Sequence, residues 1–307
     1  MTMNSTMLRS FACFLLLGCT LSARAATLVD DTFLDANRTD PVTYSEMGVD
    51  TDLDLNVESR WFGSTLSATA SHLTGTVGTG SASWTTYFTD TFANSINLGG
   101  IGQKMIITWV FTPTTVNAGN ASQGFRMAIA QSTSGGRLAA DGTPASQAFT
   151  GYAIFQNMAP TLARANNDNL DIMERTNLVS SDLLSTGSNW QKAAGGGTQT
   201  TEGFVSGTQY TFVFSAERTG SGLQLDASFT GGNIDGDGSL TASFLDTTPN
   251  SYSFDTFALR PSSSTSAAAS FDTTLFRVEY VPEPSVMILV LGGAGLMCLV
   301  HRLRQRN

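Results

Sequence analysis

Hydrophobic and polar positions alternate along most of the chain with a period of two residues. In residues 104–111 one face carries Met105, Ile107, Trp109 and Phe111. The same spacing recurs in the segments 124–131, 209–216, 222–229 and 271–280. Successive side chains of a β-strand point to opposite faces of a sheet, so this spacing predicts strands with one apolar face. The middle of the chain has no sustained apolar period of 3.6 residues, and we therefore predict an all-β fold.

Weaker strand patterns fill the intervals between these segments. We predict them near residues 28–33, 66–73, 83–88, 149–157, 170–176, 240–244 and 254–260. The turn sequence Thr219-Gly220-Ser221-Gly222 predicts a hairpin between the strands at 209–216 and 222–229. About a dozen short strands at this spacing are typical of a two-sheet antiparallel sandwich. We expect the long polar connections at 132–147, 178–203 and 261–270 at its rims.

The N-terminus has the organisation of a secretory signal peptide. A short n-region ends in Arg9, an apolar run follows, and Ala23-Arg24-Ala25 forms a small-x-small cleavage site. Because the apolar run is shorter than the ~20 residues that span a bilayer, we predict cleavage after residue 25 and export of the remainder. The run Leu16-Leu17-Gly18-Cys19 offers an alternative, lipidation of Cys19.

The C-terminus has the pattern of a stop-transfer anchor. Residues 286–300 are apolar and contain three glycines that would permit close helix packing. The basic residues Arg302, Arg304 and Arg306 follow, which the positive-inside rule places on the cytoplasmic side. The pattern predicts a transmembrane helix that holds the exported chain at the inner membrane, at least until it is sorted to the cell surface or the extracellular matrix.

Pro282-Glu283-Pro284 directly precedes this apolar run. The order Pro-Glu-Pro, apolar helix and basic end resembles the PEP-CTERM sorting domain, over residues 281–307. The resemblance implies that an exosortase-like membrane protease is a partner and that Pro282, Glu283 and Pro284 are its recognition motif. An ordinary single-pass anchor preceded by a chance Pro-Glu-Pro is the alternative.

Composition narrows the function of the single domain expected over residues 26–280. All three cysteines lie outside it, so it has neither a disulfide nor a thiolate metal site. It carries 11 basic and 24 acidic residues, a net charge of −13. Nucleic acid selects basic surfaces, so this charge argues against nucleic-acid binding.

The ends of the domain resemble those of concanavalin A-like (LamG-type) jelly rolls. The resemblance rests on the segments 31–39 and 61–62 near the start and 254–260 and 271–280 at the finish. It implies that the first and last strands pair and that the domain tends to bind glycans. A fold alone does not imply a reaction.

One segment, Asn169-Leu170-Asp171-Ile172-Met173-Glu174, resembles the catalytic strand of laminarinase-type glycoside hydrolases. Retaining hydrolysis needs two carboxyl groups about 5 Å apart, and a β-bulge would be needed to bring Asp171 and Glu174 to one face. Asn169 occupies the position of the nucleophile, and an amide cannot form the glycosyl ester. We therefore assign no catalytic residue and expect an ordinary strand.

Two further features are candidates for binding. Asp235 and Asp237 lie in a Gly-rich turn and would offer oxygen ligands to calcium, although a tight hairpin connection explains the turn equally well. A structural calcium elsewhere in such a jelly roll cannot be placed from the sequence. Trp190 lies in a polar stretch, where an exposed loop tryptophan would be a ligand-binding residue.

These observations favour a non-enzymatic, exported surface or extracellular-matrix protein, either structural or associated with extracellular polysaccharide. A carbohydrate-binding module is the alternative. A divergent glycoside hydrolase or lyase is the third hypothesis, and it depends on Glu174 acting as an acid/base.

Overall fold

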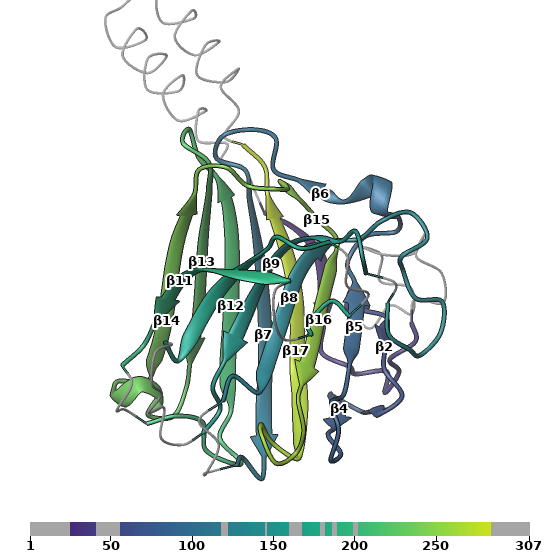
Figure 1. Cartoon of the computed structure of the whole chain (residues 1–307). Helices are drawn as coiled ribbons and strands as arrows, with labels where there is room; N and C mark the ends of the chain where they lie inside the picture. Colours follow the sequence, from purple (N-terminus) through teal and green to yellow (C-terminus); the bar gives the residue numbers. More distant parts are fainter. Residues whose placement is uncertain are drawn as a thin grey trace, which may run out of the picture.

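The computed structural model describes residues 25–40, 56–117, 122–144, 146–159, 168–178, 182–185, 189–198 and 202–283. These residues form two antiparallel β-sheets packed face to face (Figure 1). The prediction of an all-β, two-sheet jelly-roll sandwich is therefore confirmed.

The eight-stranded sheet contains the segments with the clearest alternation. Its order is β14 (Ser239–Asp246), β13 (Leu223–Thr230), β12 (Tyr210–Arg218), β7 (Lys104–Thr114), β17 (Ser270–Val281), β4 (His72–Thr76) and β3 (Leu66–Thr69). The first strand, β1 (Ala26–Asp31), pairs antiparallel with the last strand, β17. Both the predicted hairpin, β12–β13, and the predicted pairing of the first and last strands are confirmed.

The seven-stranded sheet faces it. Its order is β11 (Trp190–Gly196), β10 (Leu170–Arg175), β9 (Thr150–Gln156), β8 (Phe125–Gln131), β16 (Thr256–Pro261), β5 (Trp84–Tyr87) and β2 (Trp61–Phe62). A small third sheet pairs β6 (Ile96–Asn97) with β15 (Ser253–Phe254). Two short 3-10 turns, η2 (Phe92–Asn94) and η3 (Ile234–Gly236), complete the described elements.

The main hydrophobic core lies between the two sheets and is rich in aromatic rings. Trp109 on β7 stacks on Phe111, with ring centroids 4.0 Å apart, and contacts Phe125 from the opposite sheet at 5.8 Å. Its indole N–H donates to Thr273 Oγ1 at 3.0 Å, so the one polar atom of the ring is satisfied. The core residues of β7, β12 and β13 are those that the two-residue alternation places on one face.

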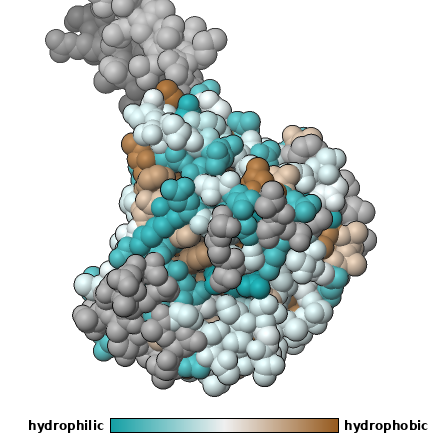
Figure 2. All heavy atoms as spheres, viewed as in Figure 1, coloured by the Kyte–Doolittle hydropathy of each residue, from teal (hydrophilic) through white to brown (hydrophobic). Residues whose placement is uncertain are grey.

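A second, smaller cluster covers the outer face of the seven-stranded sheet. Phe155, Leu183, Leu184 and Trp190 pack there over the small residues of β8, β9 and β16. This outer face is therefore partly closed by its own connecting segments. The large apolar side chains that are exposed in the described part of the chain, Leu34, Ile101, Leu178, Val205 and Leu245, include no aromatic residue. Figure 2 shows hydrophilic residues over much of one face, with strongly hydrophobic ones in small areas only.

The prediction of a helical inner-membrane anchor needs correction. In the parts of the chain that the structure describes, no helix is long and apolar enough to cross a membrane. Neither the expected transmembrane helix nor the inner-membrane location is supported, and we do not propose them. The apolar run at 286–300 and the basic residues Arg302, Arg304 and Arg306 lie outside the described residues.

Candidate functional site

The glycosidase-like segment forms β10, where Asp171 and Glu174 point to opposite faces of the sheet. Leu170 and Ile172 belong to the inter-sheet core, whereas Met173 packs on the outer face. The alternation therefore turns Asp171 outward and Glu174 inward. The register irregularity at this point places the extra residue in β11, while β10 pairs with β9 without a shift. The bulge that would bring both carboxyl groups to one face is absent from β10.

Asp171 is held by neighbouring side chains. It is 1% exposed and lies 2.7 Å from the Lys192 ammonium, which also contacts Asp168 at 2.7 Å. Gln123 donates its amide N–H to the other oxygen of Asp171. Asn169, at the position of the missing nucleophile, donates its side-chain N–H to the Thr198 carbonyl at 2.6 Å. Both residues thus stabilise the connections around β10.

Glu174 lies at the edge between the sheets and accepts a hydrogen bond from the Asn250 backbone N–H at 3.4 Å. Partial burial, and then the charge of Asp246, raise the pKa of the Glu174 carboxyl above its usual value. Asp246 accepts a hydrogen bond from the Tyr152 hydroxyl at 2.7 Å. Burial and this hydrogen bond raise the pKa of Tyr152, so the hydroxyl keeps its proton and remains the donor.

The sequence predicts Trp190 in an exposed loop, and this prediction is wrong. Trp190 begins β11, is 6% exposed, and packs edge-on against Phe155 with centroids 6.1 Å apart. Its indole N–H donates to the Leu183 carbonyl at 2.9 Å, and the buried Arg175 guanidinium lies over its ring. The polar residues next to Trp190 in the sequence do not indicate that its side chain is buried in the cluster on the outer face of the seven-stranded sheet.

Asp235 and Asp237 both lie in the turn between β13 and β14, where each accepts a backbone hydrogen bond. Asp235 adopts a left-handed conformation (φ 56°) and accepts from the backbone N–H and the hydroxyl of Thr198 at 2.8 and 2.9 Å. Asp237 accepts from the Ser239 N–H at 2.9 Å. Within the described residues, no group of three or more His, Cys, Asp or Glu side chains could hold a metal ion. Calcium binding therefore stays a prediction from the sequence.

The sorting and cleavage residues lie at the two limits of the described chain. Pro282 and Glu283 directly follow β17, and Glu283 is exposed, whereas Pro284 lies outside the described residues. Ala25 directly precedes β1, and Ala23 and Cys19 lie outside. Signal cleavage, lipidation and sorting therefore stay predictions from the sequence.

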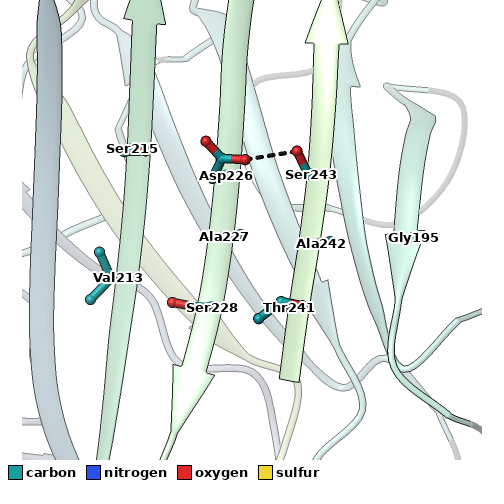
Figure 3. A pocket seen from close by; sticks show the side chains of 9 residues that line it. All are labelled: Gly195, Val213, Ser215, Asp226, Ala227, Ser228, Thr241, Ala242 and Ser243. Carbon is teal, nitrogen blue, oxygen red and sulfur yellow. Dashed lines mark hydrogen bonds between the residues drawn. The ribbon is translucent and has the colours of Figure 1, made fainter. Parts of the chain in front are cut away.

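A hollow of about 430 Å³ lies on the outer face of the eight-stranded sheet, over β12, β13 and β14. We call it the hydroxyl groove. Its polar lining consists of Ser215, Asp226, Ser228, Thr241 and Ser243, and Val213, Ala227, Ala242 and Gly195 complete it (Figure 3). These polar side chains occupy the strand positions that alternate with the core residues, so they lie on the outer face. Asp226, Thr241 and Ser243 are exposed there, whereas Ser215 is 7% exposed.

A small hydrogen-bond network fixes the centre of the groove. One carboxylate oxygen of Asp226 accepts from the Ser243 hydroxyl at 2.7 Å and from the Gln224 amide at 3.1 Å. The Gln224 amide also donates to the Ser243 hydroxyl oxygen at 2.8 Å. Figure 3 shows the second oxygen of Asp226 turned away from Ser243. The exposed carboxylate is thus oriented by neutral partners, and among the described residues no group donates to its second oxygen, which can accept from a ligand.

Glycine at the end of β11 shapes one side of this groove. A Cβ atom on Gly196 would collide with the Thr241 carbonyl oxygen, and one on Gly195 would collide with the Asp168 carboxylate. Only glycine therefore allows β11 to pass this close to β14. The sequence prediction rests on the inward residues of β12 and β13. The same alternation places the outward residues of these strands together on the outer face of the sheet, where they line the groove.

No protein-family model matches the chain, and no curated protein matches it. Among solved structures, the potassium-bound carbohydrate recognition domain of Emp46p has a TM-score of 0.46 at 9% identity, covering 82% of this chain and 95% of that chain. Winged bean acidic lectin complexed with methyl-alpha-D-galactose has a TM-score of 0.44 at 13% identity, covering 74% and 93%. Lectin II from Ulex europaeus has a TM-score of 0.42 at 11% identity, covering 74% and 94%. Because these TM-scores lie below 0.5, we transfer neither ligands nor site residues from these proteins.

Proposed function

We propose that residues 26–280 form a carbohydrate-binding domain and that the hydroxyl groove is its binding site. The observation that carries this proposal is the lining of the groove: four hydroxyl side chains and one carboxylate around a hollow of about 430 Å³. Serine and threonine hydroxyls both donate and accept hydrogen bonds, as sugar hydroxyls do, and a carboxylate accepts from two of them. The volume falls in the usual range of ligand pockets, about 300–1,000 Å³.

The apolar part of the groove supports the same ligand class. Val213 provides a small apolar surface beside the hydroxyls, whereas the side chains of Ala227 and Ala242 belong to the core between the sheets. A sugar ring likewise has hydroxyls at its edge and C–H groups on its faces. Since none of the described residues that line the groove is aromatic, hydrogen bonds rather than ring stacking would supply most of the specificity.

Binding without chemistry fits the groove better than hydrolysis. Among the described residues that line the groove, Asp226 is the one ionisable side chain, and hydrolysis by paired carboxyl groups needs a second one. The opposite orientations of Asp171 and Glu174 give no support to a hydrolase at β10. We therefore propose a non-enzymatic role, with the divergent hydrolase as the less supported alternative.

Exchanging Asp226 for asparagine tests the site. The Asp226→Asn variant keeps the shape of the side chain and removes the charge, so charge-assisted hydrogen bonds to sugar hydroxyls are lost. We expect binding weakened by at least about tenfold, or ~1.4 kcal/mol, in calorimetric titration with a glycan selected on an array. Asp237→Asn, a matched change in the exposed β13–β14 turn, should leave the affinity unchanged. Equal affinity of Asp226→Asn and the parent chain would place the site elsewhere.

Sorting through Pro282, Glu283 and Pro284 by an exosortase-like protease is the second proposal. It is favoured by the position of Pro282 and Glu283, which follow the final strand at the surface of the domain. We expect the mature chain to be shorter in a host that has an exosortase than in one that lacks it. Intact-mass measurement of the chain from both hosts would show the same mass if the motif is not recognised.

A further inference from the structure

We propose that the ligand of the hydroxyl groove is an uncharged polysaccharide chain that lies across the strands from β14 to β17. This inference rests on the proposed function and extends it from a single sugar to a polymer. It is based on the surface that continues the groove on β7 and β17. We call this surface the track and define it by Ile106, Thr108, Arg277 and Glu279.

The register of the strands makes the track continuous with the groove. Val213 in the groove lies opposite Thr108, and Ser215 lies opposite Ile106. Across the next interface, Thr108 lies opposite Arg277 and Ile106 lies opposite Glu279. All four track residues are half-exposed and alternate with core residues, so they share the outer face with the groove.

The length of this surface exceeds what one sugar ring would cover. Four intervals separate β14 from β17, which gives ~19 Å at the usual strand spacing of ~4.8 Å. Strands in a sheet are rotated by about 20–25° from one to the next, so a rigid planar ligand would lose contact across it. Sugar rings joined by rotatable bonds can follow the twist ring by ring.

The chemistry of the track also suits a sugar chain. Ile106 offers an apolar contact for the C–H face of a ring, and Thr108 offers a hydroxyl beside it. At the far end, the Arg277 guanidinium donates to Asp30 at 2.7 Å, which fixes its position and offsets its charge. The hydrogen bond to Asp30 raises the pKa of Arg277, so the guanidinium keeps its charge.

The negative charge of this surface favours an uncharged polysaccharide. Asp226 in the groove and Glu279 in the track are both acidic, and residues 26–280 have a net charge of −13. A polyanionic polysaccharide would be repelled by this field, and its acid groups would meet Arg277, which is already paired with Asp30. The neutral hydroxyls and apolar side chains of this face carry no such penalty for an uncharged glycan.

The dependence of affinity on the length of the oligosaccharide provides the decisive test. The full-length protein is titrated in a calorimeter with uncharged oligosaccharides of one linkage, from disaccharide to decasaccharide, and with an acidic polysaccharide. We expect affinity to rise by at least about tenfold from the shortest to the longest chain. The double variant Ile106→Ala, Thr108→Ala should lose this gain and keep the affinity for the disaccharide. Thr76→Ala, an exposed threonine on β4 outside the track, is the matched control and should behave as the parent chain.

The outcomes separate this inference from the proposed function. If short and long chains bind equally and Asp226→Asn weakens both, the track is wrong and the groove stands. If no glycan of any length binds, the proposed function itself fails. Tighter binding of the acidic polysaccharide would overturn the uncharged ligand class. A dimer in light scattering that the double variant converts to a monomer would show that a second copy of the chain occupies this face.

Discussion

Replacing Asp255 by alanine is expected to lower the free energy of unfolding by about 3–5 kcal/mol, because it leaves a largely buried guanidinium without its counter-charge. Asp255 is fully buried and lies 2.8 Å from Arg137 Nη2. Its carboxylate also accepts from the backbone N–H and hydroxyl of Ser132 at 2.7 and 2.6 Å and from the Ser95 hydroxyl at 3.1 Å. This network ties β16 to the segment that follows β8.

Urea denaturation of the Asp255→Ala variant measures this effect as a lower midpoint with an unchanged slope. Asp141→Ala is the matched control, because Asp141 forms an exposed ion pair with Arg38 at 2.8 Å. Hydrogen bonds from Arg38, and then from the Gly63 N–H, lower the pKa of Asp141. Exposed ion pairs contribute little, so we expect a loss within about 1 kcal/mol. Similar losses in the two variants would contradict the assignment of Asp255 as the central buried charge.

Replacing Asp31 by asparagine is expected to remove a pH dependence of stability. Asp31 is buried at the end of β1, and burial raises the pKa of its carboxyl to about 7 from the ordinary value of 3.8. Ser59, through its hydroxyl and its backbone N–H, and the backbone N–H of Phe33 donate to the carboxyl and partly offset this shift. The folded protein therefore holds this proton more tightly than the unfolded chain does.

The sign of the pH effect follows from this direction. The contribution of Asp31 to stability is fully present below about pH 4 and is lost as the pH rises through about 7, with a slope of at most ~1.4 kcal/mol per pH unit and a total on the order of 4 kcal/mol. Asp31→Asn should flatten the slope of the unfolding free energy between pH 4 and 7. Ser59→Ala, which removes a donor to the carboxylate, should extend the decline to higher pH. An unchanged slope in Asp31→Asn would mean that the carboxyl is ionised throughout this range.

The sequence predicted those parts of the fold in which every second residue enters the core. In β7, β12 and β13 the alternation identified both the strands and their buried faces. The sequence does not predict strand β11, whose residues fall within the polar connection expected at 178–203. Its sequence, Trp-Gln-Lys-Ala-Ala-Gly-Gly, has little alternation, because its place is set by the burial of Trp190 and by the close approach of Gly196 to β14.

The candidate sites show a similar limit. Residues three apart on a strand face opposite sides, so Asp171 and Glu174 could meet only through a bulge, and the sequence does not reveal which strand carries it. The structure places that irregularity in β11. The alternation predicts which residues of β12 to β14 point outward, but short polar residues form no recognisable motif. Only the register of the three strands brings these residues together into the hydroxyl groove.

Locating the bound glycan on the domain tests the central claim most directly. Backbone amide NMR signals of the full-length protein would be followed during titration with an uncharged oligosaccharide. We predict that the largest shift changes fall on Ser215, Asp226 and Ser243 of the hydroxyl groove and extend to Thr108 with longer chains. Changes confined to the outer face of the seven-stranded sheet, around Asp171 and Trp190, would contradict the assignment of the groove as the binding site.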